Sequence, residues 1–286
     1  MTGLNEVIQS FIDTLVTAGI PPQRPSEIVG DGQLHRFQVE GDKSGTKNGY
    51  YVLHLGRAPA GFYGSWRLGI GHKWRADNQK SLTPADREAV RQEVKATQDR
   101  ERQALIARQM SAARQAQVNL RDSRPADPRH PYLKAKGIPP LRSRQQGPNL
   151  VLPIVDLQSR ELMSLQFIRP DGVKRFLTGG RKSGGVIPVA GRTSGAERVL
   201  ITEGWATGAS LAVMEPDALV LAALDAGNLH PVATAARKRW PSVELIIAAD
   251  ADRVGVEKAR AAAVAARALI AVPQFPEGIA GSDWND

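Results

Sequence analysis

The chain has 286 residues, of which 42% are hydrophobic and 23% charged, and it carries a formal net charge of +9. It contains no cysteine and only 5 scattered histidines, which excludes disulfides and zinc–thiolate sites and argues against a histidine zinc site, so we expect no zinc. No apolar run approaches the ~20 residues of a membrane span, and the first residues, MTGLNEVIQSFIDTL, lack the basic start of a secretory signal. We therefore expect a cytoplasmic protein of roughly two domains, with no membrane partner.

The charge is unevenly distributed along the chain. Residues 195–286 hold 8 basic and 12 acidic side chains, a net of −4, whereas residues 1–194 hold 30 and 17, a net of +13. A basic part joined to an acidic part suits a protein that holds a polyanion with one part and metal cations with the other. Basic faces also serve solubility alone, so both interpretations stay open here.

Residues 1–80 are predicted to form a small β domain. Apolar side chains in residues 4–18 follow helical spacing, and Gly19 and Pro21 end this helix. The pattern then changes to short strands between glycine-rich turns, which indicates a small antiparallel sheet with strands at about 35–39, 49–55, 60–66 and 73–76.

Residues 81–121 are predicted to form a long charged linker helix. The segment 84–119 is rich in Ala, Gln, Glu and Arg and is opened by Pro84. Its sparse apolar positions favour a solvated connecting helix, with an arm that contacts nucleic acid as the alternative. The Pro- and Arg-rich segment 122–148 that follows is interpreted as a linker that enters a new domain.

Residues 122–194 and 195–286 are predicted to form a basic β subdomain and a parallel α/β domain. The first carries strands at 149–156, 161–168, 174–178 and 185–190. In the second, strands and helices alternate, with strands at 199–202, 218–224, 243–249 and 270–273 and helices at 205–214, 230–240 and 254–269. This alternation predicts a parallel sheet covered on both faces, and a fold class of α/β with α+β parts.

Three carboxylates follow two strands of the predicted parallel sheet. Glu203 comes directly after the strand VLIT, and Asp250 and Asp252 come directly after VELIIAA. Ligands of open parallel sheets bind beyond the carboxyl ends of the strands, and Mg²⁺ prefers such oxygen ligands. The pattern therefore predicts a magnesium site, although aspartates that end a strand are also common helix caps.

The segments VLITEGWATGASLA, LAALDAGNL, ELIIAADADRVGVEKA and GSDWND resemble the TOPRIM domain of bacterial-type primases, topoisomerases and certain nucleases. The likeness is greatest to primases of conjugative plasmids and phage-like mobile elements, and it covers about residues 130–286. It implies that Glu203, Asp250 and Asp252 coordinate Mg²⁺, or Mn²⁺ in its place. It also implies that Asp283 joins them as a metal ligand and that two further polar residues lie near the site, Asn285 and Asp286.

The resemblance further implies a basic β subdomain that holds template and nucleotide. Its candidate contacts to phosphate are basic residues around the predicted hairpins, with polar residues of LAALDAGNL as additional candidates. These candidates are Lys174, Arg175, Arg181, Lys182, Arg169 and Lys136, together with Asp225 and Asn228. A charged hairpin turn without a ligand is the alternative for each basic residue.

The N-terminal sheet lacks the cysteines of the zinc ribbon that conventional primases carry at this location. Any recognition of template there must depend on aromatic and basic groups, which can stack on bases and follow phosphates. The candidates are Tyr50, Tyr51, Phe62, Trp66, Lys73, Trp74 and Arg75. Placement of the aromatic residues in a hydrophobic core is the alternative.

The resemblance implies a DNA primase that uses single-stranded DNA as template and nucleoside triphosphates as substrates. A TOPRIM nuclease and a non-catalytic nucleic-acid-binding module are the alternatives. A topoisomerase is disfavoured because the 4 tyrosines all lie in small leading segments. Since no GxxxxGK[ST] segment occurs, a replicative helicase is expected to be a separate partner chain.

Overall fold

The computed structural model of the chain describes residues 3–56, 58–76, 83–276 and 281–286. Its contacts divide the chain into two units, Met1–Arg102 and Gln103–Asp286. Among the helices in the described ranges, none combines the length and the apolar character needed to cross a bilayer.

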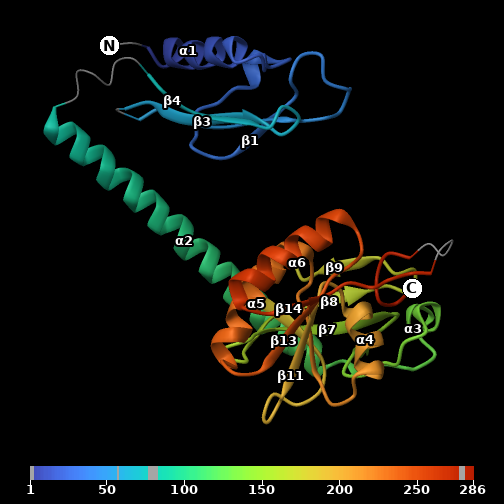
Figure 1. Ribbon diagram of the computed structural model, residues 1–286. Helices are drawn as coiled ribbons and strands as arrows, with labels where there is room; N and C mark the ends of the chain where they lie inside the picture. Colours follow the sequence, from blue (N-terminus) through green and yellow to red (C-terminus); the bar gives the residue numbers. More distant parts are fainter. Residues whose placement is uncertain (1–2, 57, 77–82, 277–280) are drawn as a thin grey trace. The chain divides into compact units, whose positions relative to one another are not determined.

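The N-terminal unit contains a helix packed on a four-stranded antiparallel sheet, as the sequence predicts. Helix α1 lies along one face of the sheet, whose strands are ordered β1-β2-β3-β4 (Figure 1). Every third or fourth side chain of α1 is buried, which is the amphipathic pattern that drives such packing. The elements are α1 (Leu4–Thr17), a 3-10 turn η1 (Pro25–Glu27), β1 (His35–Phe37), β2 (Gly49–His54), β3 (Ala60–Ser65) and β4 (Ile70–Arg75).

The candidate aromatic residues of this sheet divide between its two faces. Tyr51 and Trp74 are buried in the core against α1, so their predicted role in template contact is wrong and the core alternative holds for them. Their neighbours along the strands alternate to the other face. There Phe62 is 37% exposed, and Trp66, in the turn after β3, is 52% exposed.

Helix α2 (Pro84–Arg121) runs for 38 residues and crosses from one unit to the other. Ala112 and Ala116 are buried in its last turns, and Ala116 packs against Val151 and Leu165. The small side chains let the helix approach the sheet closely. The expected solvated helix is therefore correct only for its earlier turns.

The C-terminal unit begins with the end of α2 and continues with short strands before the α/β alternation. The first group is β5 (Arg124–Pro125), α3 (Pro131–Lys136), β6 (Arg144–Gln146), β7 (Asn149–Asp156), β8 (Leu162–Ile168), β9 (Lys174–Phe176) and β10 (Gly185–Ala190). The second is β11 (Arg198–Thr202), α4 (Trp205–Met214), β12 (Leu219–Ala222), η3 (Ala226–Asn228), α5 (Leu229–Arg239), β13 (Glu244–Ala248), α6 (Arg253–Ala266) and β14 (Leu269–Ala271).

One sheet runs through both groups in the order β14-β13-β11-β12-β10-β7-β6-β5, with β8 and β9 extending from β7. The strands β14, β13, β11 and β12 are parallel, as predicted. Strand β10 pairs antiparallel with β12. Hydrogen bonding is therefore continuous across the position where the sequence suggested a boundary, between residues 194 and 195.

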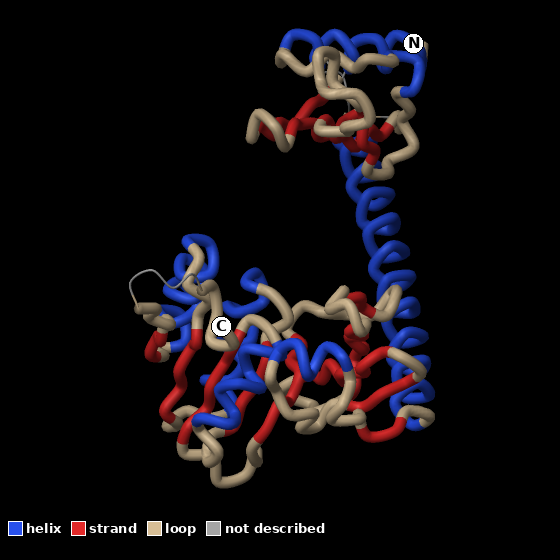
Figure 2. Tube along the Cα trace, turned by 90° about the vertical axis from the view of Figure 1, so that its right-hand side faces the viewer, coloured by secondary structure: helices blue, strands red, loops and turns tan. Residues whose placement is uncertain are grey.

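Helices cover both faces of the parallel strands (Figures 1 and 2). Helix α4 packs on one face, in a core that it shares with β7, β8 and α3. Helices α5 and α6 pack on the other face. Burial on both faces explains why these strands are continuous apolar runs in the sequence.

The segment 122–148 belongs to this fold and is not the linker that its composition suggested. Strand β5 pairs with β6, and α3 buries Tyr132 and Leu133 in the core beneath α4, together with Ile138. Proline and arginine dominate the composition, but Tyr132, Leu133 and Ile138 are buried, whereas Leu141 is 37% exposed. The composition of the segment does not indicate which of its residues are buried.

Candidate active site

The parallel strands bring the predicted carboxylates to one edge of the sheet. Strands β11 and β13 are direct neighbours, and their register pairs Thr202 with Ala248. Glu203 follows the first of these residues at once, and Asp250 follows the second after one alanine. The two side chains therefore leave adjacent strands at the same edge.

Asp250 is half-buried, and its Oδ1 atom has no hydrogen-bond partner among the described residues. The pKa of Asp250 is raised to about 7, first by burial and then by the nearby charges of Glu203, Asp283 and Asp252. Lys174 opposes this shift without cancelling it. A buried acceptor without a partner is uncommon and points to a missing ligand.

Glu203 experiences the same environment. Burial is the largest cause of its raised pKa, and the charges of Asp252 and Asp225 raise the pKa as well. A hydrogen bond with the backbone of Ala226 and the charge of Lys174 lower it in part. The site thus holds more negative charge than its own cations compensate.

Asp252 has a structural role in addition to its charge. It is the N-cap of α6, where its Oδ1 accepts a hydrogen bond of 2.8 Å from the Gly255 backbone N–H. The helix-cap alternative considered for this residue therefore holds. The cap uses only one oxygen of the Asp252 carboxylate, and the charge of this carboxylate still raises the pKa values of Glu203 and Asp250.

The donor set suits a divalent cation bound through oxygen. Among the described residues no three acidic or histidine side chains already converge at metal-ligand spacing, so binding would require the carboxylates to turn toward one another. The unpaired Oδ1 of Asp250 and the raised pKa values are what a cation would relieve. Carboxylate oxygens are the ligands that Mg²⁺ and Mn²⁺ prefer.

The last described segment, residues 281–286, closes over the loop that carries these aspartates. The Ala251 N–H donates to the Ser282 carbonyl at 2.7 Å, and the Trp284 indole N–H donates to the Ala249 carbonyl at 3.0 Å. Sequence reasoning missed the indole and serine contacts. The tryptophan in GSDWND was the available signal, because an indole N–H needs a partner when it is buried.

The polar residues of this segment do not share one role. Asp283 is close enough to raise the pKa of Asp250. Asn285 donates to the Lys136 carbonyl at 2.7 Å and to Ser210 Oγ at 2.9 Å, and so ties the segment to α3 and α4. Asp286 instead accepts hydrogen bonds within its own turn.

Lys174, at the start of β9, is the predicted basic residue that lies beside the carboxylates. Its charge acts on both Glu203 and Asp250, and a Cβ at Gly204 would lie 4.0 Å from its Nζ. Lys174 and Lys136 also line a shallow cavity of about 560 Å³. Two lysines in one cavity next to an acidic site suit an anionic group such as a triphosphate.

Arg175 lies away from this arrangement, whereas Arg169 is paired with Asp171, which lines the same cavity. In the β8–β9 register Lys174 pairs with Ile168 and Arg175 pairs with Phe167. Ile168 belongs to the core under α4, whereas Phe167 packs toward α2 on the opposite face, so Arg175 faces away from the carboxylates. Arg169 forms an ion pair of 3.0 Å with Asp171.

Arg181 and Lys182, in the β9–β10 loop, already have partners within the protein. Arg181 forms an ion pair of 2.5 Å with Asp156, which contributes to the lowered pKa of that aspartate. The Lys182 ammonium lies 4.5 Å from the centre of the Phe176 ring. Either residue must exchange this contact if it is to hold a phosphate.

Asn228 is a structural residue, and its predicted contact to a nucleotide is not supported by its position. Its side-chain amide donates to the carbonyls of Gly185 and Ala223 at 2.9 and 2.8 Å and accepts from the Gly184 N–H at 2.8 Å. These bonds join the β9–β10 loop to the end of β12. Asp225 caps the same turn by accepting from the Asn228 N–H at 3.1 Å.

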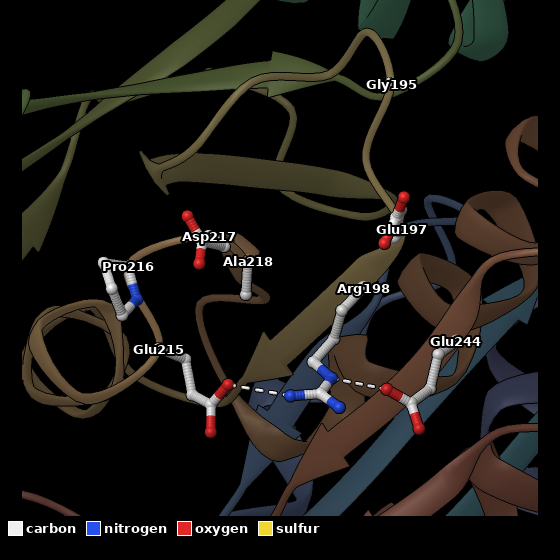
Figure 3. Close-up of a pocket in the computed structure, with 8 residues that line it drawn as sticks. All are labelled: Gly195, Glu197, Arg198, Glu215, Pro216, Asp217, Ala218 and Glu244. Atoms are coloured by element: carbon white, nitrogen blue, oxygen red, sulfur yellow. Dashed lines mark hydrogen bonds and ion pairs between the residues drawn. The ribbon is translucent and has the colours of Figure 1, made fainter.

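A second acidic pocket lies at the other, amino-terminal edge of the same strands (Figure 3). Here the Arg198 guanidinium bridges Glu215, at 2.8 Å, and Glu244. Glu197 and Asp217 complete the lining. This edge is not where open parallel sheets bind ligands, and its arginine is already paired with two of its acids.

Comparison with known proteins relates the chain to primases. The Toprim domain family matches residues 198–286. Two proteins named DNA primase TraC from Escherichia coli are similar to this chain: one is 35% identical over 235 residues, covering 78% of this chain and 21% of the relative, and the other is 33% identical over 261 residues, covering 86% and 18%.

The chain spans about a fifth of the length of these curated relatives. Among solved structures, the primase fragment of the bacteriophage T7 primase-helicase protein is 19% identical, with a TM-score of 0.40, and the match covers 54% of this chain and 66% of that one.

Proposed function

Since residues 198–286 form a Toprim domain in a chain related to DNA primases of the TraC type, we propose that this protein is a DNA primase. It synthesises short oligonucleotide primers on single-stranded DNA by metal-dependent nucleotidyl transfer. The observation that carries the proposal is the half-buried Asp250, with an unpaired oxygen and a pKa raised to about 7 beside Glu203 and Asp252.

In the proposed reaction the 3′-hydroxyl oxygen of one bound nucleotide attacks the α-phosphorus of the next nucleoside triphosphate. The bond from oxygen to the α-phosphorus forms, the hydroxyl proton is released to water, the bond between the α-phosphorus and the bridging oxygen breaks, and pyrophosphate leaves. Glu203, Asp250 and Asp252 would hold Mg²⁺ or Mn²⁺, with Asp283 beside them. When bound, the cation supplies Lewis-acid stabilisation of the negative charge that develops on the reacting oxygens.

The protein's own cations position the triphosphate. Lys174 lies between the carboxylates and the shallow cavity, where its ammonium can hold phosphate oxygens close to the reacting atoms. Lys136 lines the same cavity and its carbonyl is fixed by Asn285, so the C-terminal segment orients a phosphate contact. Positioning of this kind supplies a large share of catalysis in phosphoryl transfer.

We assign residues 122–194 the role of a basic subdomain that holds template and nucleotide, continuous with the Toprim sheet. Its contribution to the site comes through Lys174 and Lys136 and not through Arg175, which lies on the opposite face. A replicative helicase would act with the primase as a separate partner.

The proposal is tested by incubating the chain with single-stranded DNA, labelled nucleoside triphosphates and Mg²⁺, and comparing it with Asp250→Ala. We expect short labelled oligomers with the wild type and none with the variant. Shortening of the input DNA would instead establish a nuclease, and neither product would leave only a nucleic-acid-binding module. The lysines beside the carboxylates favour the primase over the nuclease, because hydrolysis needs no triphosphate site.

A further inference from the structure

The N-terminal sheet has one face that α1 does not cover, and Val94 and Glu101 of α2 line a pocket together with Val52 at one end of this face. Helix α1 packs on the face that buries Phe37, Tyr51, Leu53 and Trp74 (Figure 1). Alternation along the strands places a different set of side chains on the open face. This aromatic face consists of Arg36, Tyr50, Phe62, Trp66 and Lys73.

The rings of the aromatic face lie close to one another. The centres of the Tyr50 and Trp66 rings are 4.3 Å apart with 36° between their planes, and those of Tyr50 and Phe62 are 5.8 Å apart with 32°. Neither pair has the edge-to-face geometry that Phe11 and Trp74 adopt in the core. Modestly inclined neighbouring rings offer flat surfaces in series.

Two glycines make this arrangement possible. A Cβ at Gly64 would lie 2.6 Å from the Tyr50 ring, and one at Gly71 would lie 2.9 Å from the Phe62 ring. The Tyr50 and Phe62 rings therefore occupy space that a side chain at Gly64 or Gly71 would fill, and they pack on the backbone of β3 and β4. Phe62 and Trp66 remain 37% and 52% exposed.

The charge of the aromatic face is positive. None of the four strands, all of which are described, contains Asp or Glu, whereas they contribute Arg36, Lys73 and Arg75. The Arg36 guanidinium lies 4.6 Å from the centre of the Trp66 ring. The adjoining loop between β1 and β2 holds two acids: Glu40 is exposed, whereas the side chain of Asp42 is only 1% exposed and is paired with Arg67 at 2.9 Å.

We propose that the aromatic face binds single-stranded DNA, with bases stacked on Tyr50, Phe62 and Trp66 and phosphates held by Arg36 and Lys73. Exposed rings beside cations are what a strand with unstacked bases requires. The Arg36 guanidinium donates to the Lys47 carbonyl at 2.8 Å and would exchange this contact for a phosphate. A duplex hides its base faces and cannot use such a surface. That the strand is DNA, and serves as template, rests on the proposed primase function.

The test measures binding of a labelled oligothymidylate to the whole chain by fluorescence anisotropy, with EDTA and without nucleotides, so that its outcome does not depend on primer synthesis. We expect Trp66→Ala and Phe62→Ala each to weaken binding about tenfold. Trp66→Phe should regain most of the affinity because it restores a ring. Duplex DNA should bind the wild type more weakly than the single strand does.

Charge is tested separately through the salt dependence. Lys73→Ala should reduce the slope of log affinity against log salt by about 0.7, whereas Trp66→Ala should leave the slope unchanged. Arg24→Ala is the matched control, since Arg24 is exposed in the same unit but is paired with Glu27 outside the sheet; it should bind as the wild type does.

Cross-linking with 5-iodouracil in the oligonucleotide locates the contact. Cross-links to peptides that contain Tyr50, Phe62 or Trp66 support the proposal. Cross-links confined to residues 103–286, unchanged affinity in both alanine variants, or equal affinity for duplex and single strand would each overturn it. A loss of primer synthesis in the Asp250→Ala protein with intact oligonucleotide binding would support the two proposals independently.

Discussion

The two edges of the same parallel strands carry acidic clusters that the protein treats differently. At the amino-terminal edge, Glu215 and Glu244 are both paired with the Arg198 guanidinium. At the carboxyl edge, Glu203 and Asp250 have raised pKa values, and one oxygen of Asp250 is buried without a partner. The same sheet therefore pairs two acids of one cluster with an arginine and leaves the acids of the other cluster without such a partner among the described residues.

We infer that this difference separates structural acids from acids kept for a ligand. Burying charge that nothing compensates costs stability, and a fold retains it where function requires it. Arg198 at the amino-terminal edge shows how an arginine beside two acids lowers this cost in stability. The carboxyl edge instead holds one lysine at its margin and leaves room for a cation.

The largest expected effect comes from changing one acid at each edge. Glu203→Gln should lower primer synthesis at least about 100-fold, because it removes a charge that stabilises the reacting phosphate through the bound cation. Glu244→Gln is the matched change at the other edge and should leave the rate within about twofold. The rate is measured as labelled primer formed per minute on a single-stranded template.

Circular dichroism and thermal melting of both proteins serve as the folding control. Equal loss of activity in the two variants, with both proteins folded, would contradict the assignment of the carboxyl edge as the active site.

A smaller effect is expected from the two adjacent basic residues of β9. Lys174→Ala should raise KM for the nucleoside triphosphate about tenfold, because it removes a charged contact to phosphate. Arg175→Ala removes the same charge from the opposite face of the strand and should change KM less than about twofold. Steady-state kinetics at saturating template distinguishes them, and equal effects would show that the strand alternation does not decide phosphate contact.

The sequence predicted the carboxyl edge well, because the pattern that places it is local. Glu203 and Asp250 each directly follow an apolar strand run, and parallel pairing of those runs brings them to one edge without any further information. Strand alternation would likewise have separated Lys174 from Arg175.

Other parts depend on contacts between distant segments, which no local pattern contains. The side chain of Asn228 is held by the backbone of Gly184 and Gly185, 44 and 43 residues earlier. Segment 122–148 was interpreted as a linker because proline and arginine dominate it, yet Tyr132 and Leu133 are core residues beneath α4. Only the folded chain shows which few apolar residues are covered.

The pH dependence of stability gives a smaller and more specific effect. The pKa of Asp250 is raised from 3.8 to about 7 in the folded protein, so the folded state binds this proton more tightly than the unfolded state. The resulting stabilisation is fully present below about pH 4 and is lost as the pH rises through about 7. Glu203, whose pKa is also raised, contributes in the same direction.

Asp250→Asn should therefore gain stability relative to the metal-free wild type as the pH rises from 5 to 8. The expected gain is about 1 to 2 kcal/mol, reduced from the full shift because the group is only half-buried. Urea denaturation at the two pH values measures it. Added Mg²⁺ at pH 8 should stabilise the wild type and not the variant, and an equal response of both proteins would show that the cation binds elsewhere.

The smallest effect is expected from making the amino-terminal edge resemble the other one. Arg198→Ala leaves Glu215 and Glu244 without their cation, but all three groups are exposed, and such surface pairs contribute little. The melting temperature should fall by no more than about 2 °C at low salt. The loss should disappear at about 1 M salt, where the screening length is only about 3 Å. Primer synthesis should stay unchanged, since ligands of open parallel sheets bind at the carboxyl ends of the strands and not at this edge. A fall comparable to that of Glu203→Gln would mean that charge, and not position in the sheet, decides which cluster is functional.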